Sequence, residues 1–312
     1  MTRIILTTFT LLLIALGCSE ASSSQSTSGA AKPRIVATTT MIGDLVRQIG
    51  GEQVDLQVIM PAGVDPHTFK PSTGDLGAIS RATLVFYNGL HLEGKMVELF
   101  EHQIKDRAVA ITRDVKPDQL LAWSQGESGA HDPHIWFDAR LWVSAAQTVG
   151  TELARIDPKN AAMYQQRTQQ VMTDLNKLHD EMKSKLATIP KEKRVLITSH
   201  DAYSYFGRAY DVEVRGLQGI STETEAGIQA INAAVDFIIA RKIPALFVES
   251  SVSPKTIQRV QADCKARGVE VTIGGELYSD AMGQPGEHPG YEVHTYDGML
   301  RYNVDTIVKA LQ

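Results

Sequence analysis

Four side chains of this sequence stand where they could bind one divalent metal ion together. His67, His134 and His200 each lie where a predicted strand or loop gives way to the next element, and Asp280 follows a further predicted strand. In open α/β sheets, ligands bind at the carboxyl ends of the strands. Three imidazoles and one carboxylate suit zinc, and they also accept manganese or ferrous iron when the carboxylate binds through both oxygens.

The local sequence around these residues favours a shared site. The first two histidines occur in a repeated motif, Asp65-Pro-His67 and Asp132-Pro-His134. A single loop histidine is more often a hydrogen-bonded surface group than a metal ligand. The first half of the chain repeats Asp-Pro-His, and the second half has His and Asp at corresponding strand ends. This pattern favours one metal site that is shared by all four residues.

Other polar residues of the sequence are expected to support the structure rather than to bind metal. Glu249 follows an apolar strand, where its carboxylate could hydrogen-bond a ligand imidazole. Glu223 and Glu225 precede a predicted helix and are expected to open it, because acids favour a helix N-terminus. Four further histidines lie in polar helices or in a Gly/Pro-rich loop and are expected to be solvated: His102, His179, His288 and His294.

Composition excludes several classes of protein. The chain has 312 residues, with 31 Lys and Arg against 36 Asp and Glu, and a formal net charge of −5. This balance argues against a non-specific nucleic-acid binder, which needs a basic surface to displace counterions from phosphate. With 43% hydrophobic and 21% charged residues, the composition excludes a collagen-like chain, a disordered chain and a protein with several membrane spans.

The elements that must position the four side chains form two α/β series. The first has predicted strands over residues 34–39, 54–60 and 83–87, with helices over residues 41–49 and 75–81. The second has predicted strands over residues 194–198, 212–216, 245–248 and 269–273, with helices over residues 228–241, 254–267 and 299–311. Such alternation predicts two similar lobes, each a parallel sheet flanked by helices.

A long helix is predicted between the two series. Asp157-Pro158 is a strong helix start, because Asp can cap free amides and Pro fits the first turn. Apolar residues then recur on one face until Pro190: Tyr164, Val171, Leu175, Leu178, Met182 and Leu186. A helix of about 30 residues is ~45 Å long, so it is expected to join the lobes. The alternative is a long helix inside one unbroken domain.

The N-terminus is predicted to direct the chain to a membrane surface. Residues 1–17 combine Arg3 with an apolar stretch too short to span a bilayer comfortably. Ala15-Leu16-Gly17-Cys18 resembles a bacterial lipobox, although that motif usually has Leu where this chain has Ala15. The resemblance implies that Cys18 is lipidated, and the polar residues 18–32 are predicted to form a flexible tether. The other cysteine, Cys264, is expected to be a buried helix residue rather than a disulfide partner or a ligand.

The sequence also resembles a known family over nearly its whole length. This family comprises the metal-binding lipoproteins that serve as solute-binding proteins for zinc and manganese ABC importers, the cluster A-I binding proteins. The resemblance is carried by Cys18, Val64-Asp-Pro-His67, Tyr87-Asn-Gly-Leu-His-Leu-Glu93, Asp132-Pro-His-Ile-Trp-Phe-Asp138, Ser199-His200-Asp-Ala-Tyr203, Gly216-Leu-Gln-Gly-Ile220, Val248-Glu-Ser250 and Gly274-Gly-Glu-Leu-Tyr-Ser-Asp280.

The resemblance implies a metal receptor with two lobes, residues 33–156 and 190–312, joined by a backbone helix over residues 157–189. It places the family's ligands on the same four residues that the strand ends indicate. It also implies an extracytoplasmic, lipid-anchored protein that works with an ABC permease and its ATPase, without nucleic acid. A receptor that presents both lobes to a permease is most simply a monomer.

The resemblance leaves the choice of metal open. Many zinc-dedicated members carry a His-rich loop after the first ligand region, and this chain has none. Many manganese-dedicated members have Glu at the third ligand position, where this chain has His200. The nitrogen-rich donor set slightly favours zinc over manganese, and ferrous iron remains possible.

Two other functions are compatible with the residues. A membrane-anchored zinc hydrolase could use three histidines and a carboxylate around an activated water, but four protein ligands leave little room for that water. The sequence also has no His-Glu-x-x-His helix. A surface adhesin has been associated with the family, although no adhesive motif occurs here.

Overall fold

The computed structural model describes residues 31–123 and 129–312, and these ranges bound every structural statement below. The predicted signal peptide, Cys18 and most of the predicted tether lie outside the described residues. Residues 32–312 form one compact unit. Within the described ranges, no helix is both long enough and apolar enough for a membrane span.

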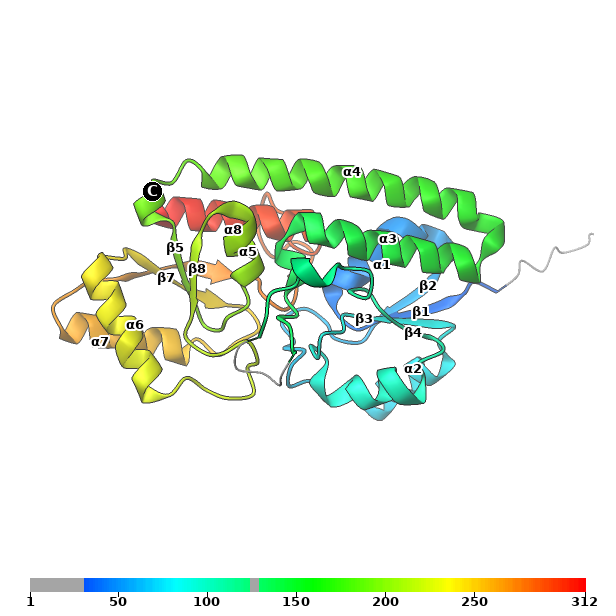
Figure 1. The fold of residues 1–312 in the computed structure, drawn as a ribbon, viewed down its shortest axis with the longest axis horizontal. Coiled ribbons are helices and arrows are strands. Elements are labelled where there is room, and N and C mark those ends of the chain that lie inside the picture. The colour runs from blue at the N-terminus through cyan, green and yellow to red at the C-terminus, as the bar shows by residue number, and fades with distance from the viewer. Residues whose placement is uncertain (1–30, 124–128) are drawn as a thin grey trace, which may run out of the picture. The chain divides into compact units, whose positions relative to one another are not determined.

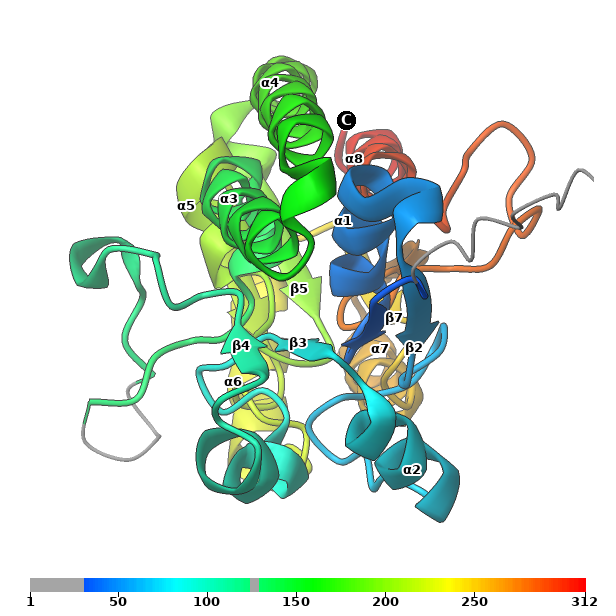
Figure 2. The same ribbon diagram turned by 90° about the vertical axis from the view of Figure 1, so that its right-hand side faces the viewer.

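The N-terminal lobe is built on a parallel four-stranded sheet in the order β2-β1-β3-β4. The strands are β1 (Arg34–Ala37), β2 (Asp55–Val58), β3 (Leu84–Tyr87) and β4 (Ala108–Ala110). Helices α1 (Thr40–Gly50) and α3 (Ala139–Ile156) cover one face, and α2 (Thr73–Arg81) lies on the other (Figure 2).

The alternation of side chains along the strands explains why helices cover both faces of the sheet. Ile35 packs into the same buried cluster as the apolar face of α1, whereas its neighbour Val36 packs with Ile79 of α2. Successive strand residues point to opposite faces. A strand that is buried on both faces therefore requires helices on both sides, as the continuous apolar sequence predicts.

The C-terminal lobe contains two parallel strand pairs. β5 (Val195–Thr198) pairs with β6 (Glu213–Gly216), and β7 (Ala245–Glu249) pairs with β8 (Thr272–Leu277). The helices of this lobe are α5 (Ser204–Tyr210), α6 (Ile228–Arg241), α7 (Lys255–Ala266) and α8 (Tyr296–Leu311). Cys264 of α7 is fully buried in the apolar cluster between α6, α7 and the strands, as expected.

Helix α4 (Ala161–Leu186) runs along both lobes (Figure 1). Its 26 residues give a length of about 39 Å. The predicted apolar face is confirmed, because all six of its residues are buried. They belong to one hydrophobic cluster that also includes Leu45 of the N-terminal lobe and Met299 of the C-terminal lobe. The two lobes therefore share a continuous core beneath α4.

Two expectations for this helix are wrong. The Asp157 side chain caps no backbone amide at the start of α4 or of the preceding turn, Pro158–Asn160. Its carboxylate accepts hydrogen bonds from Asn160 Nδ2 and from the Tyr164 hydroxyl instead. His179 is not solvated but only 3% exposed, because it lies on the inner face of α4, where its ring packs against Tyr210.

Other elements depart from the sequence prediction. Helix α3, with 18 residues, was not expected between the His134 segment and Asp157, and neither were β4 and α5. Strand β8 begins at Thr272 and continues to Leu277, beyond the predicted end at residue 273. The strand passes through the glycine pair Gly274-Gly275, and its register with β7 shifts at this point, as glycines inside strands often permit.

The contact between α3 and α4 provides a test of this packing. A Cβ added at Gly150 of α3 would overlap the Thr168 side chain of α4. We expect Gly150→Ala to destabilise the protein by about 1–3 kcal/mol, because overpacking forces the two helices apart. Gly74→Ala in α2 is the control, since its Cβ would make only an ordinary contact of 3.5 Å with Ser72. Urea unfolding measures both, and equal midpoints would contradict the packing.

Candidate metal centre

The four predicted residues come together at the carboxyl ends of the strands of both lobes. His67 lies in the loop after β2, and His134 directly precedes the turn Ile135–Phe137. His200 follows β5, and Asp280 follows β8. Their side chains form a buried cluster with exposures of 4%, 0%, 0% and 1%, respectively. Each lobe therefore supplies two residues.

Three distances between donor atoms are close to those expected for tetrahedral coordination. The distance is 3.2 Å from Nε2 of His67 to Nε2 of His134, and 3.5 Å from the latter to Oδ1 of Asp280. Oδ2 of Asp280 lies 3.3 Å from Nε2 of His200. Zinc bound at about 2.0–2.1 Å separates two tetrahedral donors by about 3.3 Å. One ligand atom from each residue lies within 4.8 Å of all the others, so the four side chains are grouped closely enough to surround one ion.

Several polar atoms of this cluster lack hydrogen bonds. Nε2 of His200 and both carboxylate oxygens of Asp280 are buried and have no hydrogen-bond partner among the described residues. Buried polar groups are ordinarily paired, and a buried carboxylate without partners is costly. The close approach of the His200 imidazole offsets part of this cost, and a cation bound among the four donors would satisfy the remaining lone pairs.

Burial and the interactions between the imidazoles and the carboxylates determine the protonation states of the four side chains. Burial and the neighbouring imidazoles lower the pKa of His67 to about 3, which keeps this side chain neutral. Burial opposes the ionised form of Asp280, but His200 holds the pKa of this carboxyl below its usual range. For His200, burial is outweighed by Asp280 and Glu249, which raise its pKa well above 6.5. Because coordination needs a neutral imidazole, an incoming metal ion would displace the His200 proton.

Two carboxylates outside the donor set orient two of the histidines. Nδ1 of His200 lies 2.6 Å from Oε2 of Glu249, which confirms the expected role of that residue. Nδ1 of His134 lies 2.7 Å from Oδ1 of Asp132. A carboxylate that accepts the Nδ1 proton of an imidazole leaves the Nε2 lone pair free for a metal. Both rings therefore present Nε2 to the centre of the cluster.

The contribution of Asp132 was missed in the sequence, although its motif was recognised. In both Asp-Pro-His repeats, the aspartate accepts the backbone N–H of the histidine at 2.9 Å. Only Asp132 also reaches the Nδ1 atom of its own histidine. For His67, no hydrogen bond to Nδ1 occurs among residues 31–123 and 129–312. The repeat therefore predicts the same backbone turn in the two loops. It does not predict the ring contacts, because an aspartate holds the ring of His134 but not that of His67.

The loop that carries Asp280 is fixed by contacts from both lobes. Nε1 of Trp136, beside His134 in the N-terminal lobe, donates to the carbonyl of Ser279 at 2.9 Å. The Tyr203 hydroxyl and Asn303 Nδ2 both donate to the carbonyl of Tyr278 at 2.8 Å. These bonds hold the carboxylate of Asp280 against the three imidazoles.

Comparison with known proteins identifies the family. The sequence profile described as ZnuA, zinc-uptake complex component A, periplasmic, matches residues 35–310. The chain belongs to this family. Members of the ZnuA family are solute-binding proteins that work with the permease and ATPase of ABC importers, and they are not enzymes. This membership decides against the hydrolase that the sequence left open.

Individual relatives match over most of their length. The manganese-binding lipoprotein MntA of Bacillus subtilis is 40% identical over 279 residues, which cover 89% of this chain and 90% of MntA. The zinc-binding protein TroA of Treponema pallidum is 41% identical over 296 residues, or 95% of this chain and 94% of TroA. The solved structure of TroA matches with a TM-score of 0.85, covering 90% of this chain and 99% of that one. The two-lobe α/β fold is thereby confirmed.

The orienting carboxylates provide a test of the site. We expect Glu249→Gln and Asp132→Asn each to weaken zinc affinity about 10–100-fold, because an amide no longer fixes the imidazole tautomer. Glu270→Gln is the control, since Glu270 is exposed. Competition with a chromophoric chelator measures the affinities. Wild-type affinity in both variants would show that these carboxylates do not orient ligands.

Proposed function

We propose that this protein captures one divalent transition-metal ion between its two lobes and delivers it to the permease of an ABC importer. His67, His134, His200 and Asp280 are the proposed ligands, and the metal is cargo rather than a resident cofactor. In this proposal, residues 33–156 and 190–312 are the metal-binding lobes, and residues 157–189 connect them.

The convergence of four buried donor side chains, whose ligand atoms lie within 4.8 Å of one another, carries the proposal. Structural zinc sites are closed by four protein ligands, whereas catalytic sites keep a position for water. Four protein donors from two lobes therefore suit capture of an ion. Neither lobe alone completes the coordination shell, so closure of the lobes depends on the metal.

Release requires the two pairs of ligands to separate. The continuous core under α4 opposes a large hinge motion, since opening it would expose apolar side chains. We therefore infer that loops at the site and small shifts of the C-terminal lobe provide the opening. The permease would accept the ion when the four donors part.

The choice of metal is part of the proposal. MntA is named for manganese and TroA for zinc, so the relatives include proteins for both. Three nitrogen donors slightly favour zinc over manganese, and ferrous iron is a third possibility. The Irving–Williams order gives zinc a higher affinity than manganese for such a donor set. The metal that is carried then depends also on supply.

The N-terminal sequence and the relatives support a proposed location. MntA is named a lipoprotein. We propose that Cys18 of this chain carries the lipid and that the protein is a monomer on the outer side of a bacterial cell membrane, facing the periplasm or the extracellular space. Residues 18–32 would tether the lobes to that surface.

Removal of a proposed ligand tests the function. We expect the full-length protein to bind one equivalent of zinc, and His200→Ala to lose most of this affinity. Metal at 1,000 times its Kd stabilises the folded state by about 4 kcal/mol, so zinc should raise the melting temperature of the wild type but not of this variant. His102→Ala is the control, because its side chain is 67% exposed. Equal zinc-induced shifts in all three proteins would contradict the assignment.

The physiological metal needs a separate measurement. We expect zinc to displace manganese from the stripped protein in vitro, because three imidazoles bind zinc more tightly. Elemental analysis of protein recovered from its native membrane then identifies the cargo. Zinc in both experiments supports zinc uptake, whereas manganese in the native sample would show that supply sets the cargo. Absence of any stoichiometric metal from both would contradict the proposed function.

A further inference from the structure

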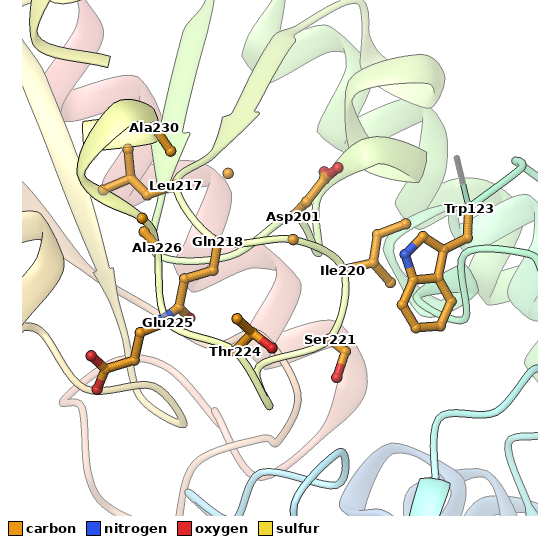
Figure 3. A pocket seen from close by; sticks show the side chains of 13 residues that line it. Trp123, Asp201, Leu217, Gln218, Ile220, Ser221, Thr224, Glu225, Ala226 and Ala230 are labelled. Atoms are coloured by element: carbon orange, nitrogen blue, oxygen red, sulfur yellow. The ribbon is translucent and has the colours of Figure 1, made fainter. Parts of the chain in front are cut away.

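A segment of the C-terminal lobe reaches across to the N-terminal lobe beside the metal centre. This segment, residues 217–227 between β6 and α6, is called the strap below. Figure 3 shows it curving past Trp123 of the N-terminal lobe, which lies next to Ile220. The strap and Trp123 line a cavity of about 500 Å³. The start of the strap is held to its own lobe by backbone hydrogen bonds from Leu217 to Thr198 and from Gln218 to Ser199, whereas part of the strap borders this cavity.

Two polar contacts fix the strap to the N-terminal lobe. The Thr222 hydroxyl donates to Oδ2 of Asp65 at 2.5 Å. Nζ of Lys95 lies 2.6 Å from Oε1 of Glu223. The expected role of Glu223 at a helix start is therefore wrong: α6 begins at Ile228 with no acid in its first turn and no side-chain cap.

Asp65 links the strap to the metal centre. Its Oδ1 atom accepts the backbone N–H of His67 at 2.9 Å, while its Oδ2 atom accepts from Thr222 and from Thr68. One carboxylate therefore holds the backbone of a proposed ligand and a residue of the opposite lobe. Movement of the strap acts on the His67 loop through a single side chain.

His67 is the histidine that needs this support. His134 and His200 are oriented by carboxylates of their own lobes, Asp132 and Glu249, whether or not the lobes are closed. Among the described residues, the His67 ring has no such partner. Within the N-terminal lobe, its loop is held by the hydrogen bonds that Asp65 accepts from the His67 N–H and from Thr68. The additional bond from Thr222 to the same carboxylate forms only when the strap meets the N-terminal lobe.

We propose that the strap is a latch, in which Thr222 and Asp65 position His67 and, with the Lys95–Glu223 pair, set the rate at which metal leaves the closed protein. This inference rests on the proposed function. Contacts made only in the closed state stabilise the bound form without changing the encounter with metal, so they act mainly on dissociation. Opening of the strap would free the His67 loop first and leave a three-donor site.

The hydroxyl of Thr222 provides the sharpest test. Thr222→Val keeps the side-chain shape and removes the donor, whereas Thr222→Ser keeps the donor. We expect Thr222→Val to speed zinc release about tenfold, as loss of a hydrogen bond to a charged group implies, and Thr222→Ser to restore nearly wild-type release. Stopped-flow mixing of zinc-loaded, full-length protein with excess chelator measures the rate.

The ion pair permits a charge-swap test. Lys95→Glu and Glu223→Lys each place like charges together, and we expect each to speed release about threefold, since both side chains are about half exposed. The double swap, Lys95→Glu with Glu223→Lys, should return the rate to that of the wild type. The difference between single and double variants should shrink at high salt.

Two further readouts separate a latch from a merely structural role. In a latch, the zinc association rate and the urea midpoint of the metal-free protein stay unchanged while dissociation accelerates. Equal losses in association and stability would overturn the proposal, and so would wild-type release from Thr222→Val. That last result would leave the proposed function intact if the wild type binds zinc and His200→Ala does not. Failure of the wild type to bind zinc, manganese or ferrous iron would overturn both.

Discussion

The buried carboxylate of Asp280 is the constraint on which the centre depends. An ionised group removed from water costs several kcal/mol unless opposite charge and hydrogen bonds surround it. In this protein, no hydrogen bond to either carboxylate oxygen is found in the described ranges, and three imidazoles stand close by. The backbone just before this residue is held from both lobes, because Trp136 donates to the carbonyl of Ser279 and Asn303 donates to the carbonyl of Tyr278. The lobes therefore meet at a place that favours a cation.

Rigidity and motion are divided between different parts of the molecule. The core beneath α4 is shared by both lobes, so separating them widely would expose apolar surface. The strap borders a cavity and is fixed to the opposite lobe by two polar contacts. Contacts of this kind break at much lower cost than a packed core. A receptor must hold its cargo and also release it, and this division permits both.

Much of the centre could be predicted from the sequence, because metal donors are recognisable by residue type and strand ends by hydrophobic runs. The positions of His67, His134, His200 and Asp280 follow from those two signals. The course of β8 could not be predicted, since the Gly274-Gly275 pair weakens the strand pattern in the sequence and is here accommodated by a register shift. The pairing of Glu223 with Lys95 was equally hidden, because it joins residues of different lobes whose approach only the tertiary structure defines.

The most direct test of the central claim is a crystal structure of the zinc-loaded protein with anomalous scattering data at the zinc edge. The proposed function predicts one strong peak between the lobes, about 2.0–2.1 Å from Nε2 of each of the three histidines and from a carboxylate oxygen of Asp280. A fully occupied zinc at any other position, with these four side chains uncoordinated, would contradict the account.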